Sequence, residues 1–170
     1  ADNSARLSDN LRLTNTLSFT ISKTTVENVN IPQIITNAGL AETFFDRTSR
    51  IYLEAAVPRT KGTLTNNLSV GEDWNVFLRN SYFGEVEEAT NTVDGVDPYY
   101  GGKVVTDLSF SHNFAEGVRF TLGANNLFDV YPDEADPSFQ SGGRFIYSRR
   151  STQFGTAGRF LFARLNFTIK

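Results

Sequence analysis

The feature that most constrains the fold is a strict alternation of apolar and polar side chains. In the segment 11–21 every even position is Arg, Ser or Thr, and every odd position except one asparagine is Leu, Phe or Ile. A period of two places the apolar side chains on one face of a β-strand. We therefore expect six strands, each with one apolar and one polar face. The alternating segments are 11–21, 63–70, 74–82, 107–111, 118–124 and 161–169.

The same pattern excludes a membrane-spanning helix. Such a helix needs about 20 mostly apolar residues, whereas the longest uninterrupted apolar run is 160–163 and the mean hydropathy is -0.29. A transmembrane β-strand needs only about 10 residues, of which half face lipid. A polar average is therefore compatible with a β-barrel.

Charge and cysteine content exclude several other classes. The 16 Lys and Arg residues against 19 Asp and Glu give a net charge of -3, so the basic surplus of a nucleic-acid-binding protein is missing. The sequence contains no cysteine. Disulfides, structural zinc fingers and thiol nucleophiles are therefore excluded.

The connections between the expected strands differ strongly in length. Two tight polar turns are expected at 71–73 and 115–117, whereas the connections near 25–60, 87–101 and 129–156 are long. Short turns at one end and long loops at the other are typical of outer-membrane barrels. A soluble β-sandwich also alternates and stays open as an alternative. Polar faces rich in Thr, Ser and Asn rather than Lys and Glu favour the barrel.

The segment 123–129 ends the fifth expected strand and reads GANNLFD. It resembles the G-x-x-N-L-F-D signature on the penultimate strand of TonB-dependent outer-membrane receptors. The matching residues are Gly123, Asn126, Leu127, Phe128 and Asp129.

The segment 158–169 resembles the closing strand of the same receptors, which opens with Gly-Arg. The matching residues are Gly158 and Arg159 at its start and Phe167 near its end. Ile169 stands where family members usually carry a terminal aromatic residue. The resemblance covers roughly residues 10–170.

This resemblance implies an all-β fold, an antiparallel transmembrane β-barrel with short periplasmic turns and long extracellular loops. The whole chain, 1–170, would supply C-terminal strands of a larger, 22-stranded barrel, and no plug domain is present in it. The strands facing lipid would expose Leu17, Phe19, Ile21, Phe110, Phe120 and Phe167. The lumen would carry Arg12, Arg79, Arg119 and Arg164.

The resemblance also implies a function and a location. The protein would be part of an active transporter in the bacterial outer membrane that imports a scarce nutrient such as a ferric siderophore, cobalamin or a glycan. Its implied partners are the rest of the receptor barrel and plug, the TonB energising complex acting through the plug, lipopolysaccharide and outer-membrane lipid, and the small nutrient ligand. No nucleic-acid partner is expected.

Two alternatives remain at this stage. Adding 5–7 and 51–57 as strands would give eight, which is enough for a self-contained small barrel serving adhesion or anchoring. The receptor interpretation instead treats 51–57 as an ordered part of a long loop. A soluble carbohydrate-binding sandwich is the third hypothesis.

The long loops contain the candidate ligand-binding residues. Tyr99 and Tyr100 precede two glycines, so two exposed aromatic rings on a flexible stalk are expected. The last long loop mixes cations and rings in Arg144, Tyr147, Arg149 and Arg150. Such side chains hold an anionic iron chelate by charge and stacking, or a sugar by stacking.

Nothing in the sequence indicates catalysis or a cofactor. His112 is the only histidine and is expected at the turn end of a strand, so no Ser-His-Asp arrangement can be argued around it. The acidic loop residues lack calcium-loop spacing, and we expect them to be solvated. The sequence therefore predicts a non-enzyme with no metal site and no cofactor.

Overall fold

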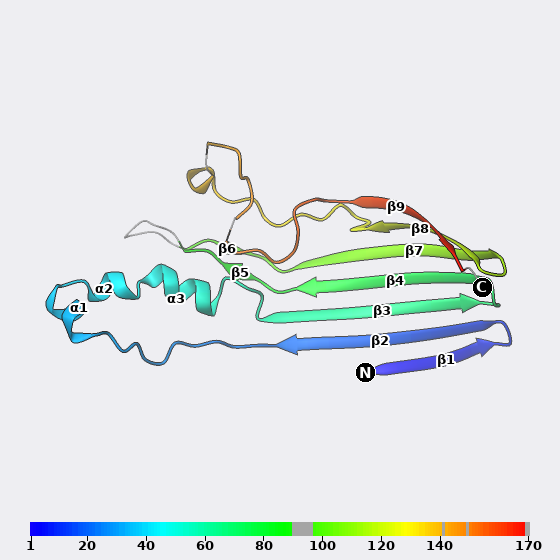
Figure 1. The fold of residues 1–170 in the computed structure, drawn as a ribbon, viewed down its shortest axis with the longest axis horizontal. Coiled ribbons are helices and arrows are strands. Elements are labelled where there is room, and N and C mark those ends of the chain that lie inside the picture. The colour runs from blue at the N-terminus through cyan, green and yellow to red at the C-terminus, as the bar shows by residue number, and fades with distance from the viewer. Residues whose placement is uncertain (90–96, 141, 149, 169–170) are drawn as a thin grey trace.

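The computed structural model describes residues 1–89, 97–140, 142–148 and 150–168. Its main element is an antiparallel seven-stranded sheet in the order β1-β2-β3-β4-β7-β8-β9 (Figure 1). The strands are β1 (Asp2–Ser8), β2 (Leu11–Ile21), β3 (Thr60–Val70), β4 (Trp74–Phe83), β7 (Lys103–Ala115), β8 (Val118–Asn125) and β9 (Phe160–Phe167). Each strand therefore lies beside the next long strand along the chain.

The alternating segments lie in strands of this sheet, the last of them in β9 as far as Phe167, but the count of six is wrong because β1 adds a seventh. Only Ala5 and Leu7 alternate in β1, so its own pattern is weak, and it forms by pairing with β2, with Ala5 opposite Leu13. The eight-strand alternative is right for 5–7, which lies in β1, but wrong for 51–57, most of which lies in the helix α3 (Arg47–Glu54). Within the described residues β1 pairs only with β2 and β9 only with β8, so the sheet has two open edges.

The register of the sheet collects the apolar side chains on one face, which we call the apolar face. Directly opposed residues share a face, and one such row crosses six strands. This row is Leu13, Leu68, Val76, Phe110, Leu122 and Ala163. The residues expected to face lipid all lie on the apolar face, namely Leu17, Phe19, Ile21, Phe110, Phe120 and Phe167.

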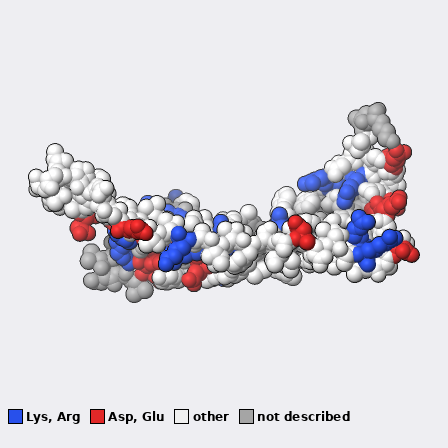
Figure 2. Space-filling view, turned by 90° about the horizontal axis from the view of Figure 1, so that it is seen from below, with Lys and Arg blue, Asp and Glu red and all other residues white. Residues whose placement is uncertain are grey.

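The opposite face, which we call the polar face, carries the four arginines expected in the lumen. Arg12 and Arg164 lie in a single row with Ser69, Asn75, Ser111 and Thr121 between them. Arg79 lies opposite Asp107, and Arg119 lies opposite Asn166. Figure 2 shows that charged side chains gather mainly toward the two ends of the molecule on the side in view.

The apolar face is not covered by the rest of the chain. Ile21 is 72% exposed and Phe167 is 65% exposed. The second sheet consists only of β5 (Val86–Glu87) and β6 (Tyr99–Tyr100), too small for a sandwich, which needs two facing sheets around a core. The chain exposes 11739 Å², whereas a compact protein of 18.9 kDa exposes about 8,300 Å². The sandwich hypothesis is therefore wrong.

The connections have the predicted asymmetry. The short turns after β1, β3 and β7 lie at one end of the sheet, the turn end, and the long connections lie at the other, the loop end (Figure 1). The long connections carry α1 (Gln33–Asn37), α2 (Ala41–Phe44), α3, β5, β6 and the 3-10 helix η1 (Pro137–Phe139). None of the helices in the described ranges is long and apolar enough to cross a membrane.

The helices of the first long connection were not predicted from the sequence. They are five, four and eight residues long, which is too short for a clear helical period. The best local signal is Asp46, whose carboxylate caps α3 by accepting a hydrogen bond from the Ser49 backbone N–H at 2.7 Å.

The turn glycines provide a test of the hairpin geometry. Gly117 and Gly71 both have positive φ, of 78° and 63°, so alanine at either position costs about 1–2 kcal/mol. A Cβ at Gly117 would also lie 3.0 Å from the Thr168 carbonyl oxygen, whereas a Cβ at Gly71 meets open space. We expect Gly117→Ala to reduce the free energy of unfolding more than Gly71→Ala in chemical denaturation. Equal losses would contradict the close approach of Thr168.

Candidate functional site

Asn126 forms a clamp where the chain leaves β8 at the loop end. Its φ of 51° lies in the left-handed region, which asparagine tolerates better than most residues. The side-chain Oδ1 accepts a hydrogen bond from the Val130 N–H at 2.8 Å, and Nδ2 donates to the Val130 carbonyl at 2.7 Å. Asn126 is only 7% exposed. The asparagine of the motif therefore holds both backbone groups of Val130 and fixes the turn.

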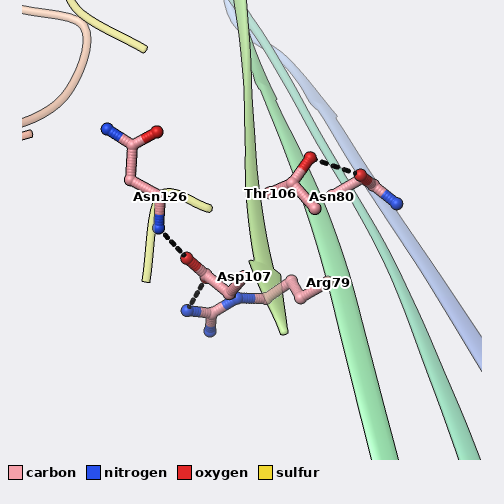
Figure 3. Close-up of polar contacts among 5 residues, drawn as sticks. All are labelled: Arg79, Asn80, Thr106, Asp107 and Asn126. Atoms are coloured by element: carbon pink, nitrogen blue, oxygen red, sulfur yellow. Dashed lines mark hydrogen bonds and ion pairs between the residues drawn. The ribbon is translucent and has the colours of Figure 1, made fainter. Parts of the chain in front are cut away.

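Asp107 connects this turn to the neighbouring strands on the polar face (Figure 3). Its Oδ1 accepts a hydrogen bond from the Asn126 backbone N–H at 2.9 Å. Its Oδ2 accepts hydrogen bonds from Arg79 Nε at 2.8 Å and Arg79 Nη2 at 2.5 Å. One carboxylate therefore joins β4, β7 and the end of β8. We call Arg79, Asp107 and Asn126 the polar clamp.

Asp129 joins the two sequence motifs, although they lie 30 residues apart. Its Oδ1 accepts a hydrogen bond from the Arg159 backbone N–H at 2.7 Å, so the last motif residue of one segment holds the start of β9. Gly158 has a φ of 70°, and a Cβ there would collide with the Tyr131 hydroxyl and lie 2.8 Å from Asp129 Oδ1. A side chain at position 158 would therefore require both a left-handed backbone and displacement of the Tyr131 and Asp129 side chains.

Gly123 is required by packing on the polar face. A Cβ at this position would lie 2.5 Å from Phe162 Cζ and 2.7 Å from Ser109 Cβ. Phe162 is the cross-strand partner of Gly123 on β9, and its ring covers the glycine, an arrangement that supports glycine in strands. The glycine that opens the motif therefore allows β8 and β9 to pack closely.

The remaining motif residues have simpler environments. The Leu127 backbone N–H donates to the Thr106 carbonyl at 2.7 Å, while the Phe128 ring is 68% exposed. Phe167 lies opposite Val118 at the turn end of the apolar face. Ile169 lies outside the described residues.

A small apolar core holds the long loops together. It contains Val86, Tyr100 and Ala135, with Phe139 packed against it. Tyr100 is 4% exposed, and its hydroxyl donates to Glu88 Oε2 at 2.7 Å. Burial and this hydrogen bond raise the pKa of Tyr100. The prediction that the Tyr100 ring is exposed is therefore wrong, because pairing of β5 with β6 turns successive side chains to opposite sides.

Tyr99, unlike Tyr100, faces solvent, with 64% exposure. It lines a groove of about 400 Å³ together with Arg59, Glu85 and Glu87. A hydrogen bond to Glu87 and the negative charge of that carboxylate raise the pKa of Tyr99. The groove therefore offers an aromatic ring, one guanidinium and two carboxylates.

The other candidates do not line this groove. Arg150 packs on Tyr52 of α3, with its guanidinium 5.3 Å from the ring centroid and Nη1 donating to the hydroxyl at 3.3 Å. Tyr147 stacks on Tyr131, with ring centroids 5.9 Å apart. Arg144 is exposed, and Arg149 lies outside the described residues. The structure thus spreads the five described candidates over several places in the loops.

Two buried or half-buried polar residues that tie the loops together were missed at the sequence level. Gln153 is 5% exposed, and its Nε2 donates to the carbonyls of Gly84 at 2.5 Å and Gly101 at 2.8 Å. Asp133 accepts hydrogen bonds from Lys103 Nζ at 2.5 Å and from the Gly101 N–H at 2.7 Å. The prediction that the acidic loop residues are all solvated is wrong for Asp129 and Asp133, and also for Asp97, which is 8% exposed and forms an ion pair with Arg47. No local sequence signal marks these long-range contacts.

The single histidine lies in an aromatic cluster at the turn end. His112 stacks on Trp74 at a ring-centroid distance of 4.0 Å and contacts the edge of Phe114 at 4.6 Å. Across the described ranges, no group of three or more His, Cys, Asp or Glu side chains is arranged to hold a metal ion.

Comparison with solved structures finds the same architecture within larger receptor and transporter structures. The chain matches the ferric-catecholate import receptor Fiu from E. coli K12, in its closed form, over 98% of its own length with a TM-score of 0.58 and 16% identity. It matches a mutant of the ferric enterobactin receptor PfeA from Pseudomonas aeruginosa, in complex with enterobactin, with a TM-score of 0.55 and 13% identity over 98% of its length. It also matches the copper transporter OprC with a TM-score of 0.50 and 16% identity over 98% of its length.

These neighbours are TonB-dependent receptors, so the chain has the fold of a segment of such a receptor. It spans only 20% of the length of Fiu, 21% of PfeA and 22% of OprC. The sequence matches no protein-family model and no curated protein. The resemblance seen in the motifs is therefore confirmed at the level of the fold.

The polar clamp leads to a stability prediction. We expect Asn126→Ala to reduce the free energy of unfolding by about 2 kcal/mol, because it removes two hydrogen bonds from a buried turn. The neighbouring Asn125→Ala is the matched control, since Asn125 is exposed at the end of β8. Chemical denaturation of both variants measures the difference. A loss no larger for Asn126→Ala than for Asn125→Ala would contradict the clamp.

The Asp133 contacts predict a pH dependence of the loop structure. Lys103 and the Gly101 N–H lower the pKa of Asp133 in the folded protein. Its stabilising effect is therefore complete above the ordinary aspartate pKa near 3.9, and it is lost as the pH falls through the lower folded-state pKa. We expect the protection of the Gly101 amide, which is its exchange rate relative to the intrinsic rate at the same pH, to fall on acidification below about pH 4, and Asp133→Asn to remove that pH dependence. Unchanged pH dependence in Asp133→Asn would contradict this assignment.

Proposed function

We propose that this chain forms C-terminal wall strands of the barrel of a TonB-dependent transporter in the bacterial outer membrane. The observation that carries the proposal is a largely apolar face that crosses the sheet and is not covered by the chain itself, on an open sheet with the fold of import receptors. Lipid is the environment that accepts such a face without aggregation.

The dimensions of the strands support a transmembrane position. A tilted transmembrane strand needs about 9–11 residues, and β2 and β3 have 11 residues while β4 has 10. We infer that the apolar face contacts lipid and that the polar face lines the lumen against the plug. The turn end would then be periplasmic and the loop end extracellular.

The two open edges support membership of a larger barrel. In hydrocarbon every backbone N–H and C=O group needs a protein partner, so a spanning sheet must close. The smallest transmembrane barrels have eight strands, and the described sheet has seven. We infer that further strands of the receptor pair with β1 and β9, as in the 22-stranded barrel that the family resemblance implies.

The transported substrate is proposed as a scarce nutrient bound at the extracellular mouth. The neighbours are described as receptors for ferric catecholates and enterobactin and as a copper transporter, and we propose a ferric siderophore as the first candidate. Tyr99, Arg144 and Arg150 offer an exposed ring and exposed cations at the loop end. The plug, the TonB complex and lipopolysaccharide are the proposed partners.

Uptake measurements in whole cells test the proposed transport. Cells that express the complete protein are supplied with radioactive iron as a ferric catecholate, with and without a functional TonB system. We expect uptake that requires both the protein and TonB. The proposal would be overturned if uptake, of iron and in a parallel assay of copper, did not depend on the protein or did not depend on TonB.

Charge scanning by depth tests the membrane orientation. Leu108 lies near the middle of β7 on the apolar face, whereas Phe167 lies at the turn end of that face. Lysine at the bilayer midplane of a barrel costs about 2–4 kcal/mol, and near an interface it costs about 0–1 kcal/mol. We expect Leu108→Lys to reduce the free energy of unfolding in detergent or lipid much more than Phe167→Lys.

A polar-face variant controls for the general effect of adding a charge. Asn67 lies in the middle of β3 on the polar face, opposite Phe77. Asn67→Lys is expected to cost less than Leu108→Lys because the lumen is hydrated. The reverse order would show that the apolar face does not contact lipid.

A further inference from the structure

The register of the edge strand β9 on β8 is not fixed by its alternation. Phe160 and Phe162 lie on the polar face, opposite Asn125 and Gly123, so apolar residues occupy both faces of the first half of β9. A slip of two residues would also keep every side chain on its own face, because the side-chain period of a strand is two. The backbone hydrogen bonds of an antiparallel pair repeat with the same period. Alternation therefore permits more than one register.

The connection between the two strands does not fix the register either. In a hairpin the length and type of the tight turn determine which residues pair. β8 and β9 are instead joined by the long segment 126–159, and within the described residues β9 has no second neighbour in the sheet. Tertiary contacts must therefore select the register that the structure shows, in which Leu122 lies opposite Ala163.

Charge opposes one of the two slips that keep the faces. If β9 moved two residues toward the turn end, Arg119 would lie directly opposite Arg164 instead of its present partner Asn166. Like charges directly opposite one another destabilise a strand pair. If β9 moved two residues toward the loop end, Leu165 would lie opposite Leu122, and no like charges of β8 and β9 would be opposed. The second slip must therefore be prevented by other contacts.

The first such contact is the packing of the Phe162 ring over Gly123. Phe162 Cζ would lie 2.5 Å from a Cβ at position 123, so the ring occupies space that a side chain there would fill. The Arg164 guanidinium in turn lies 5.8 Å from the centroid of this ring. In the register slipped toward the loop end, Phe162 would lie opposite Asn125, and the ring would leave the space above the glycine.

The second contact is the hydrogen bond from the Arg159 backbone N–H to Asp129 Oδ1, at 2.7 Å. A slip of two residues moves the start of β9 by about 6.6 Å, which is farther than a hydrogen bond extends. Asp129 is held in place by its own turn, because its backbone N–H donates to the Asn126 carbonyl at 2.9 Å. The backbone N–H of Asn126 is in turn bound by Asp107. The slip would therefore break this contact as well.

We propose that Gly123 with Phe162, and Asp129 with the Arg159 backbone, form a register lock that selects the pairing of β9 on β8. These are positioning residues, and the inference goes beyond the proposed transport because it concerns how the sheet is assembled. In a closed barrel the stagger of the strands is linked to their tilt and to the diameter. The register lock thus sets the stagger that β9 contributes to the wall.

Cysteine pairs across β8 and β9 report the register directly, because this chain has no cysteine of its own. In the complete protein, Leu122→Cys is combined with Ala163→Cys, which reports the register of the structure, or with Leu165→Cys, which reports the slipped register. Directly opposed residues are close enough for a disulfide, whereas diagonal neighbours lie about 7–8 Å apart. With the register lock intact, we expect oxidation to join the first pair and little of the second.

The register lock is removed by combining Phe162→Ala with Asp129→Gly. Glycine at position 129 removes the acceptor without straining the backbone, which has a φ of 59° there. We expect the cross-linking yield of the second pair to rise at least fivefold and that of the first pair to fall. The matched control combines Phe160→Ala with Asp129→Asn. It removes a neighbouring ring of β9 but keeps the Phe162 ring and an acceptor oxygen, so it is expected to keep the parent register.

Heat-modifiable migration on gels reports that each variant still folds. Unchanged pairing in the folded double variant overturns the register lock. Loss of both cross-links also overturns it, because the contacts would then hold β9 on the sheet without selecting its register. If the double variant does not fold, Phe162→Ala and Asp129→Gly are measured separately, and each is expected to raise the yield of the second pair. The parent register alone in both single variants overturns the proposal.

Discussion

The structure depends on one constraint, which is that a β-sheet with an uncovered apolar face and open edges needs both lipid and additional strands. The apolar face extends across the sheet because the register of every strand pair keeps the alternating side chains on the same side. In water such a face associates with other surfaces, whereas in a membrane it contacts acyl chains. The same membrane requires the backbone groups at both edges to be paired.

At the loop end, charged and amide side chains bind the backbone of the loop residues that adjoin the strands. Asp107 binds Arg79 and the backbone of Asn126, and Asp129 binds the backbone at the start of β9. These contacts determine where the last long loop leaves and rejoins the sheet. Gln153, Asp133 and the core around Tyr100 then tie that loop to its neighbours. The wall thus positions the surface proposed to bind ligand.

Much of the sheet is predictable from the sequence, because alternation is a local property of each strand. β1 is not among the six strands predicted by alternation, because only Ala5 and Leu7 alternate in it. It is a strand because its backbone pairs with β2. The short helices are not predicted, because helices of four to eight residues give no clear period. The motif residues can be found by resemblance, but the contacts that explain them are tertiary. The Phe162 ring packs against Gly123, and Asp107 accepts a hydrogen bond from the Asn126 backbone N–H. Burial of Tyr100 depends on Val86 of β5 and on Ala135, which are both distant from it in sequence.

Hydrogen exchange at the outer edges of β1 and β9 tests the central claim most directly. The exchange rates are measured in the complete protein folded in detergent micelles, and the amides of the interior strand β4 serve as the internal reference. If the sheet is the wall of a larger closed barrel, the edge amides that do not pair with β2 or β8 exchange as slowly as those of β4. Rapid exchange confined to these amides in a folded protein would show that the sheet stays open, and would contradict the account.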